Sequence, residues 1–315
     1  MRHYLTLPRL EISHANAQAS GHVINACPVM AITLFAHNLA RHVYQSSPYT
    51  LPYEQVRVAI LHHDAQLLGE GGANGFFNFQ PQLRRGATFI DKTDYSSKNP
   101  HALSLQPTAT CHLTLTLLLE LPAAPNLDEV KAFLRQARLA GGKVERHEAP
   151  TVQSGDVEDL LSQLPGGFWV VERTDLMQTD PDPLTALYRA IAYQHADPAP
   201  LPLAEKTGDD HAPAKDWSSD TPRPLPMSWL VPTVLGYAGI TPFARRGGVR
   251  MSNDRRTGEL TTPDHAFAEP LLGLVQYVGR RRWVESHPIE AIPFWQPQWL
   301  QDDVFVVTQT GGEEE

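Results

Sequence analysis

The order of hydrophobic patterns along the chain is the feature that most restricts its fold. Apolar residues alternate, as they do in β-strands, in four segments: 4–12, 55–68, 111–121 and 167–176. They recur at helical spacing in two others, 28–45 and 126–142. The resulting order, strand-helix-strand-strand-helix-strand, is that of the ferredoxin-like unit, in which two helices cover one face of an antiparallel sheet. We therefore predict an α+β fold built on a ferredoxin-like, RNA-recognition-like antiparallel sheet.

The connection between the second and third predicted strands is too long for a simple loop. Residues 69–110 include an Asn74-Gly75 turn signal, a cluster of three phenylalanines within 76–79 and a β-branched patch, ATFI. Connections of this length within a compact domain are usually functional elements or disordered segments. We predict that residues 69–110, called the thumb below, form an inserted β-hairpin. Its phenylalanines either stack on nucleic-acid bases or form a small core of the hairpin itself; they are Phe76, Phe77 and Phe79.

These patterns divide the chain into five expected regions. The ferredoxin-like core comprises residues 1–68 and 111–193, and the thumb interrupts it at residues 69–110. Residues 194–226 are rich in Pro, Asp and Ala and are expected to form a mobile acidic loop. Residues 227–310 form a C-terminal extension packed on the core, with a helix near 265–282, and residues 311–315 form a disordered tail.

The distribution of charge matters more than its sum. The formal net charge of −9 argues at first sight against a nucleic-acid partner. However, residues 151–220 hold thirteen acidic and four basic residues, which leaves 22 of each in the rest of the chain. Because a binding face depends on local charge, the overall acidity does not exclude RNA.

The cysteines and the hydrophobic runs indicate the cellular compartment. Cys27 and Cys111 lie far apart, without the spacing of a metal site, which favours a reducing environment. The N-terminus lacks the apolar stretch of a secretory signal, and no apolar run is long enough to cross a bilayer. We expect a soluble, cytoplasmic protein without membrane contact.

The residues that could carry catalysis are few. His62 and Asp64 are predicted to share one face of a strand, with His63 between them, and could ligate a metal. No second cluster has recognisable ligand spacing. The fourteen histidines suit either a metal-independent RNA nuclease or ordinary polar positions. The chain has no Gly-x-Ser-x-Gly nucleophile signature, and its GEGGANG segment lacks the Lys-Ser/Thr of a phosphate-binding loop. We therefore assign no catalytic residue, no metal site and no cofactor.

Basic residues and amides suggest an RNA-binding surface. Lys131, Arg135 and Arg138 share one face of the predicted helix 126–142, which leads into Lys143. Residues 245–256 form the densest basic segment, where arginines suited to phosphate alternate with glycines and amides. Each group is either a solvated face or a binding surface. The candidate RNA-binding residues are Asn16, Gln18, Ser20, Arg84, Arg85, Arg138, Lys143, Arg245, Arg246, Arg250, Asn253, Arg255 and Arg256.

An ordered set of short motifs then resembles a known family. LPRLEISHANAQA is similar to the LPRL-x-I-x-N-A-N-A opening of the Csy-two family, the Cas-five-type subunit of type I-F CRISPR surveillance complexes. His14 stands where that family usually has the first Asn. Further similar segments follow in order: AITLFAHNLAR, RLAGGKVER, GFWVVERTDL, SWLVPTVLGYAGITPF and RMSNDRRTGE with FAEPLLGLVQYV.

The resemblance implies a role in a ribonucleoprotein. It implies a non-catalytic subunit that holds the 5′ handle of CRISPR RNA (crRNA), pairs with the large subunit and contacts a backbone subunit. The amide-rich segment 13–25 would then lie against the RNA, and the thumb would lie over the RNA and interrupt its pairing with target DNA. Two alternatives remain open: a His-based endonuclease that processes CRISPR RNA, and a structural cap without RNA contact.

Overall fold

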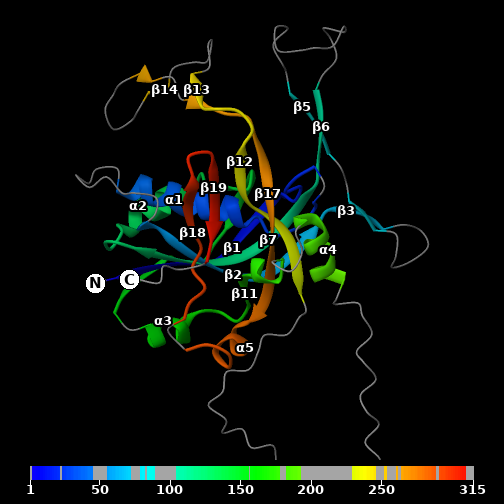
Figure 1. The fold of residues 1–315 in the computed structure, drawn as a ribbon. Coiled ribbons are helices and arrows are strands. Elements are labelled where there is room, and N and C mark those ends of the chain that lie inside the picture. Colours follow the sequence, from blue (N-terminus) through cyan, green and yellow to red (C-terminus); the bar gives the residue numbers. More distant parts are fainter. Residues whose placement is uncertain are drawn as a thin grey trace, which may run out of the picture.

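Long antiparallel strands dominate the structure, which is a computed structural model (Figure 1). It describes residues 2–21, 23–44, 55–71, 79–81, 84–88, 104–155, 157–177, 182–192, 229–245, 252–253, 260–261, 264–288 and 291–309. Some of these are described by backbone alone: 70–71, 79–81, 84–88, 104–108, 192, 252–253 and 260–261.

The main sheet joins both halves of the chain. In the described residues its strands follow the order β18-β19-β12-β17-β11-β2-β7-β1-β9-β8, and β10 also pairs with β1. The strands of the first half are β1 (His3–Asn16), β2 (Arg57–Leu67), β7 (Thr110–Leu121), β8 (Arg138–Leu139), β9 (Gly142–Arg146), β10 (Thr151–Ser154) and β11 (Phe168–Glu172). Those of the second half are β12 (Leu230–Gly239), β17 (Ala268–Gly279), β18 (Gln296–Gln301) and β19 (Val304–Thr308).

In the described residues the helices are few and mostly short. They are α1 (Val29–Val43), α2 (Leu127–Leu134), α3 (Val157–Gln163), a 3₁₀ turn (Thr174–Met177), α4 (Pro183–Ala192) and α5 (Arg280–Val284). Asn126 caps α2 by accepting a hydrogen bond from the Asp128 backbone N–H, and two acidic residues in the first turn suit the helix dipole. The mixed helix-and-strand fold with an antiparallel sheet is therefore confirmed.

The four central strands do not follow the ferredoxin-like order. In that order the fourth strand of the unit lies beside the first, whereas here β11 pairs with β2, giving β11-β2-β7-β1. The reason is that the free edge of β1 already carries β10 at one end and β9 at the other. The specific ferredoxin-like topology is thus not confirmed.

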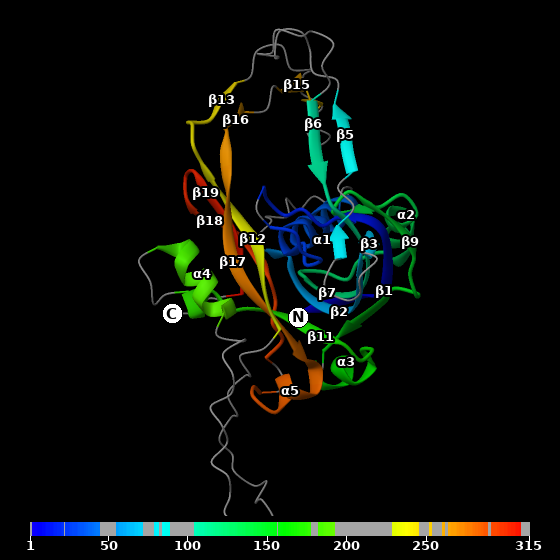
Figure 2. The same cartoon turned by 90° about the vertical axis from the view of Figure 1, so that its right-hand side faces the viewer.

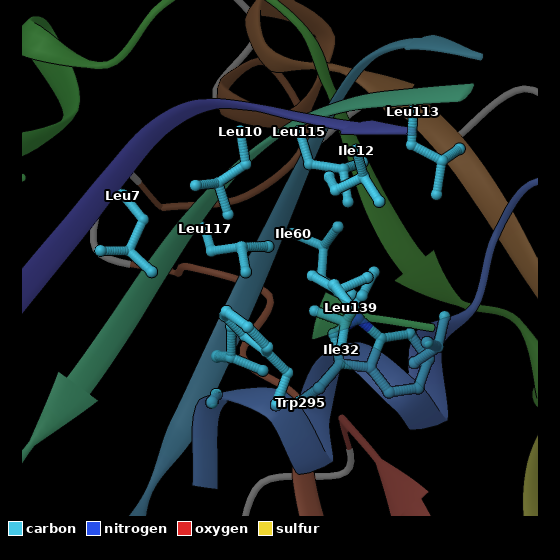
Figure 3. Close-up of a cluster of buried hydrophobic side chains, with 14 of the residues drawn as sticks. Leu7, Leu10, Ile12, Ile32, Ile60, Leu113, Leu115, Leu117, Leu139 and Trp295 are labelled. Carbon is cyan, nitrogen blue, oxygen red and sulfur yellow. The ribbon is translucent and has the colours of Figure 1, made fainter. Parts of the chain in front are cut away.

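The sheet curls until its two halves meet again. The backbone of Trp295, just before β18, exchanges two hydrogen bonds of 2.8 and 2.9 Å with Val58 of β2. The Trp295 indole is fully buried and donates to the Val170 carbonyl oxygen at 3.0 Å. Figure 3 shows it beside leucines and isoleucines of β1, β2, β7 and α1. One hydrophobic core, under α1, therefore holds the strands of both halves together.

Two predicted helices differ in the structure. The helix expected near 265–282 is wrong: residues 268–279 form β17, which pairs with β11 and β12 on either side. A strand flanked on both sides carries an almost continuous apolar run, which periodicity does not separate from a buried helix. The helix expected over 126–142 ends at Leu134. Beyond it, β8 and β9 form a hairpin with Ala140 and Gly141 in its turn, both at positive φ, as a type I′ turn requires.

Short strand pairs extend from one end of this sheet. The described thumb residues form two pairs, β3 (Gly69–Gly71) with β4 (Phe79–Pro81) and β5 (Arg84–Thr88) with β6 (Ser104–Thr108). In the second half, β13 (Ala244–Arg245) pairs with β16 (Asp264–His265), and β14 (Ser252–Asn253) pairs with β15 (Leu260–Thr261). In both views β5–β6 and β13–β16 project from the same end of the molecule, opposite α5 (Figures 1 and 2). The acidic loop (194–226) and the tail (311–315) lie outside the described residues.

Candidate nucleic-acid interface

The end of β1 is where the predicted amide-rich surface begins. Arg9 and His14 have positive φ values of 43° and 54°, and each lies where β1 changes register with β7. After the second bulge the Asn16 backbone N–H donates to the Ala140 carbonyl oxygen at 2.7 Å. The Asn16 side chain accepts from the Gln18 N–H and donates to the Gln18 carbonyl oxygen, both at 3.1 Å. Asn16 therefore shapes the turn rather than leaving its amide free.

The described residues 17–21 and 23–27, called the 17–27 hairpin below, lie between the two halves of the molecule. The Ala17 N–H donates to the Ala109 carbonyl oxygen, at the base of the thumb, and Gln18 pairs with Ile24. At its other end the side chain of Asn25 donates to Pro232, and Thr233 donates to the Cys27 carbonyl oxygen at 2.8 Å. These hydrogen bonds tie the segment both to the base of the thumb and to β12.

Two polar atoms beside this hairpin are buried without a partner among the described residues. They are the Gln18 Oε1 and the Thr110 Oγ1. Thr110 lies opposite Asn16 in the β1–β7 register, so both atoms belong to the same end of the sheet. Buried polar atoms normally have a hydrogen-bond partner, and an unpaired one calls for an explanation such as a ligand or a water. Gln18 is the predicted candidate that best fits a hydrogen-bonding role toward a ligand.

The β8–β9 hairpin brings two predicted cations together. Arg138 lies directly opposite Lys143, and Lys143 lies opposite Ser13 on β1, so the three side chains share one face. The Lys143 Nζ is 2.7 Å from the Glu145 Oε2, and the Ser13 hydroxyl donates to Glu145 at 2.9 Å. These two hydrogen bonds lower the pKa of Glu145. Arg138 and Lys143 are both exposed at the surface.

This hairpin is fixed tightly to β1. A Cβ on Gly142 would lie 2.6 Å from the Ser13 carbonyl oxygen and 2.7 Å from the Ala15 nitrogen, so only glycine fits there. Next to Ser13, the rings of His14 and His112 meet edge to face with centroids 5.0 Å apart. Ser13 lies within segment 13–25, which the resemblance places against the RNA, whereas sequence reasoning missed Thr110. The position of Thr110 at the start of an alternating strand was its only signal.

The base of the thumb reaches the same end of the sheet. Arg84 and Arg85 lie opposite Thr108 and Pro107, next to the point where β6 continues into β7. Their side chains are not described. The β1 end, the β8–β9 hairpin and the thumb base therefore form one neighbourhood, called the β1-end surface below. It comprises Ser13, Asn16, Gln18, Thr110, Arg138 and Lys143, with the backbone of Arg84 and Arg85 beside it.

The remaining predicted residues lie elsewhere or outside the description. Arg245 is on β13, opposite Asp264, beyond the end of β12. Ser20 lies near the tip of the 17–27 hairpin and is partly buried. For Phe79 and Asn253 only the backbone is described, on β4 and β14. Residues outside the described ranges are Phe76, Phe77, Arg246, Arg250, Arg255 and Arg256.

The expected common helix face of three cations is wrong. Lys131 lies in α2 and Arg135 is its C-terminal cap, but Arg138 lies on β8 after the helix has ended. Lys131 is 3.5 Å from Asp128, its neighbour on the same helix. Of the three, only Arg138 belongs to the β1-end surface.

His62, His63 and Asp64 do not form the expected shared face. The register of β2 with β7 shifts between His62 and Asp64, which leaves His63 in a bulge. His62 lies opposite the buried Leu115, whereas Asp64 lies opposite Thr114 on the outer face, so a common face for these two residues is wrong. In the described residues no three His, Cys, Asp or Glu side chains gather as metal ligands would.

Both histidine rings have structural surroundings. The His62 ring packs on Tyr277 with centroids 4.7 Å apart, and burial lowers the pKa of His62 to about 4. The His63 ring lies 2.8 Å from the Gly166 carbonyl oxygen and 2.7 Å from the Thr116 hydroxyl. Burial also lowers the pKa of His63. Each ring is part of the sheet's packing rather than of an open cleft.

Comparison with known proteins gives one consistent result. A sequence model of the family described as CRISPR-associated protein (Cas_Csy2) matches residues 5–303. The chain is 27% identical over 321 aligned residues to the CRISPR-associated protein Csy2 of Pseudomonas aeruginosa (strain UCBPP-PA14). That alignment covers 91% of this chain and 88% of the relative. Within the described residues, no helix is both long and apolar enough to traverse a membrane.

Proposed function

The chain belongs to the Cas_Csy2 family of CRISPR-associated proteins, and from this premise we propose that it is a non-catalytic, RNA-binding subunit of a type I-F CRISPR surveillance (Csy, or Cascade) complex in antiviral defence. Its ligand would be the 5′ handle of crRNA. The observation that carries the proposal is the convergence at the β1-end surface. Two exposed cations, an unpaired buried amide oxygen and the base of the thumb meet there.

The chemistry of that surface suits a bent single strand. Arg138 and Lys143 would bind phosphates, with Arg84 and Arg85 approaching from the thumb base. Gln18 would contact a base edge or a 2′-hydroxyl, which its neutral amide does without changing the charge balance. Further RNA contacts would come from segment 245–256 in the second half of the chain, through Arg245, Arg246, Arg250, Asn253, Arg255 and Arg256. Asn16 and Ser20 would stabilise the 17–27 hairpin.

The rest of the assembly follows from the same proposal. The chain would pair with the large subunit and touch a backbone subunit, and the thumb would lie over the RNA where it begins to pair with target DNA. Such a particle would act in the cytoplasm. We also propose that residues 1–68 and 111–193 derive from an RNA-recognition-like core, to which residues 227–310 were added as further strands of the same sheet.

The absence of catalysis is part of the proposal. The alternative, a His-based endonuclease, needs a histidine that is free to exchange protons with RNA. The His62 and His63 rings are instead packed or hydrogen bonded within the sheet. Incubating the assembled complex with repeat RNA tests this point. Specific cleavage that His62→Phe or His63→Asn abolishes would replace the proposal with the endonuclease.

The direct test is to purify the chain from its host and sequence the RNA bound to it. We expect RNA of defined length with a common 5′ segment, together with other CRISPR-associated proteins. Gln18→Ala should reduce the preference for that segment over a scrambled one, while Ser154→Ala, on the far end of the β1 ladder, should not. A complex that assembles fully without RNA would favour the structural cap.

A further inference from the structure

A row of aromatic rings is exposed on the second half of the sheet, far along the chain from the β1-end surface. Tyr237 of β12 lies opposite Phe305 of β19, which in turn lies opposite Trp299 of β18. The Trp299 and Phe305 rings are 5.0 Å apart between centroids, and Phe243 meets Trp299 at 6.1 Å. Tyr237, Phe243 and Trp299 are 40%, 52% and 45% exposed. These four residues are called the aromatic face below.

The aromatic face continues the surface that α1 covers. Val307, two residues after Phe305 and therefore on the same side of β19, is buried in the core under α1. Pro297, opposite Val307 on β18, is buried as well. Beyond the reach of the helix, Tyr237 and Trp299 on the same side of the strands are exposed. Contiguous exposed aromatic residues of this kind mark interaction sites in soluble proteins.

The adjoining strand edge is only partly protected. In the described residues β18 is an outermost strand, with β19 on one side and no strand along the other after Trp295. Natural edge strands are usually shielded by charged residues, by proline, by bulges or by a covering element. Pro297 lies at the start of β18 and a bulge interrupts the register with β19 at Leu300, but from Gln298 to Gln301 the strand has no charged residue and no proline, and Leu300 is 58% exposed. This edge is suited to receive a strand from another protein.

The nearby charge decides which class of partner fits. Asp302 and Asp303 form the turn between β18 and β19 and are exposed. The Gly239 N–H donates to the Asp303 carbonyl oxygen at 2.7 Å, and the Asp303 Cβ lies close above Gly239, two residues after Tyr237. At the β18–β19 turn the described charges are therefore acidic, which attracts Lys or Arg.

We propose that the aromatic face and the free edge of β18 dock a partner protein that presents an apolar patch bordered by Lys or Arg, with an extended segment pairing along β18. The inference rests on the proposed function for the premise that the chain works within an assembly. It does not depend on RNA binding at the β1-end surface, so experiments can contradict either proposal without contradicting the other.

Site-specific crosslinking in the complex purified from the host tests the proposal. A photoreactive phenylalanine derivative replaces Trp299 in one strain and Tyr188, an exposed aromatic residue of α4, in a control strain. From position 299 we expect crosslinks to a second protein, at a peptide containing apolar residues and Lys or Arg. Crosslinks to RNA, crosslinks to a second copy of this chain, or no more crosslinking than at position 188 would each overturn the proposal.

Substitutions test the proposal through the measured affinity for the partner. If Trp299 is an anchor, Trp299→Ser should weaken partner binding about 30-fold, the effect of a typical interface hot spot. Asp302→Lys combined with Asp303→Lys, which leaves the core untouched, should weaken it further as salt is lowered. Tyr188→Ser is the matched control. Bound RNA is measured in the same samples. Absence of RNA from the wild-type complex would contradict the proposed function. If Trp299→Ser and the double Asp→Lys variant bound the partner as tightly as the wild type, this inference would be contradicted.

Discussion

Arg138 and Lys143 form an arrangement that is unfavourable unless an anion is present. They lie directly opposite each other on a two-stranded hairpin, and like charges in that position are destabilising. Glu145 offsets Lys143, but both side chains are exposed, so solvent screens this ion pair and it stabilises the hairpin little. Among the described contacts, Arg138 has a long hydrogen bond of 3.4 Å to the Gly141 carbonyl oxygen. A phosphate bound by both Arg138 and Lys143 would therefore relieve their repulsion and replace only weak contacts.

If these cations bind phosphate, RNA affinity must depend on salt in a way that each substitution changes. Each phosphate neutralised on a single strand contributes roughly 0.7 to the slope of log K against log salt. Lys143→Ala and Arg138→Ala should each flatten the slope by about that amount and weaken binding to any handle sequence. The measurement is RNA binding by the complex across a salt series. Arg281→Ala is the control, because this highly exposed arginine of α5 lies at the opposite end of the molecule (Figure 1). An unchanged slope in both test variants would place the RNA elsewhere.

His62 makes stability depend on pH. Burial lowers its folded-state pKa to about 4, below the unfolded value near 6.5. The neutral ring is therefore the stable form, and the stability that it contributes is present above pH 6.5 and is lost as the pH falls toward 4. In the wild type, the free energy of unfolding should fall on the order of 2 kcal/mol further between pH 7 and 4.5 than in His62→Phe, which keeps a ring against Tyr277.

Denaturant unfolding at several pH values measures this difference. Tyr188→Phe is the comparison, since it changes an exposed aromatic residue of α4, removes no histidine and should leave the wild-type pH dependence in place. Equal pH dependence in the wild type and in His62→Phe would show that the His62 ring is not held in the neutral form.

At the scale of elements, the thumb is attached through a narrow base. Leu67 pairs with Cys111, and the Leu68 N–H donates to the Thr110 carbonyl oxygen at 2.9 Å, so the two ends of the insertion are already adjacent. The described thumb strands pair with one another and not with the main sheet. Between residues 69 and 108, the described part of the thumb therefore adds nothing to the pairing of the central strands.

Replacing residues 70–108 with a short glycine-serine linker should leave the fold intact, because the linker closes an existing hairpin between β2 and β7. We expect unchanged far-ultraviolet circular dichroism in the sheet region and a similar thermal midpoint. RNA loading should fall modestly through loss of Arg84 and Arg85, and pairing of target DNA next to the handle should change. Global unfolding of this variant would show that the thumb is part of the core.

The elements differ in how far sequence alone could predict them. The apolar periodicities of β1, β7 and α1 each fit one kind of secondary structure, and these three predictions are confirmed. The β8–β9 hairpin was hidden because Gly141 and Gly142 suit a helix end as well as a hairpin turn. The strand order β11-β2-β7-β1 could not be predicted from the sequence because it depends on β9 and β10 occupying the edge of β1. Four residues of the β1-end surface were candidates from the sequence, Asn16, Gln18, Arg138 and Lys143, but strand register is what brings them together.

At the scale of the whole molecule, the chain behaves as one sheet rather than as a core with a separate appendage. The Val58–Trp295 contact joins the start of β2 to the start of β18, and the core spans both halves. Two exposed surfaces then lie on strands that share this rigid frame. The β1-end surface is basic in its described residues, and the aromatic face is bordered by acids. A frame of this kind can hold RNA and a protein partner in a fixed relation.

The aromatic face and the bare edge of β18 lead to the last prediction, which concerns the isolated chain. Exposed apolar strands with unpaired backbone groups associate with one another when no partner covers them. The purified chain should therefore self-associate as its concentration rises, and added salt should not disperse it, because the attraction is apolar and salt screens only the repulsion between acidic borders. Sedimentation velocity across a concentration and salt series measures this. Trp299→Ser combined with Leu300→Ser should shift the chain toward monomer, whereas Tyr188→Ser should not. A wild-type chain that stays monomeric throughout the series would mean that the face is compatible with water and needs no partner.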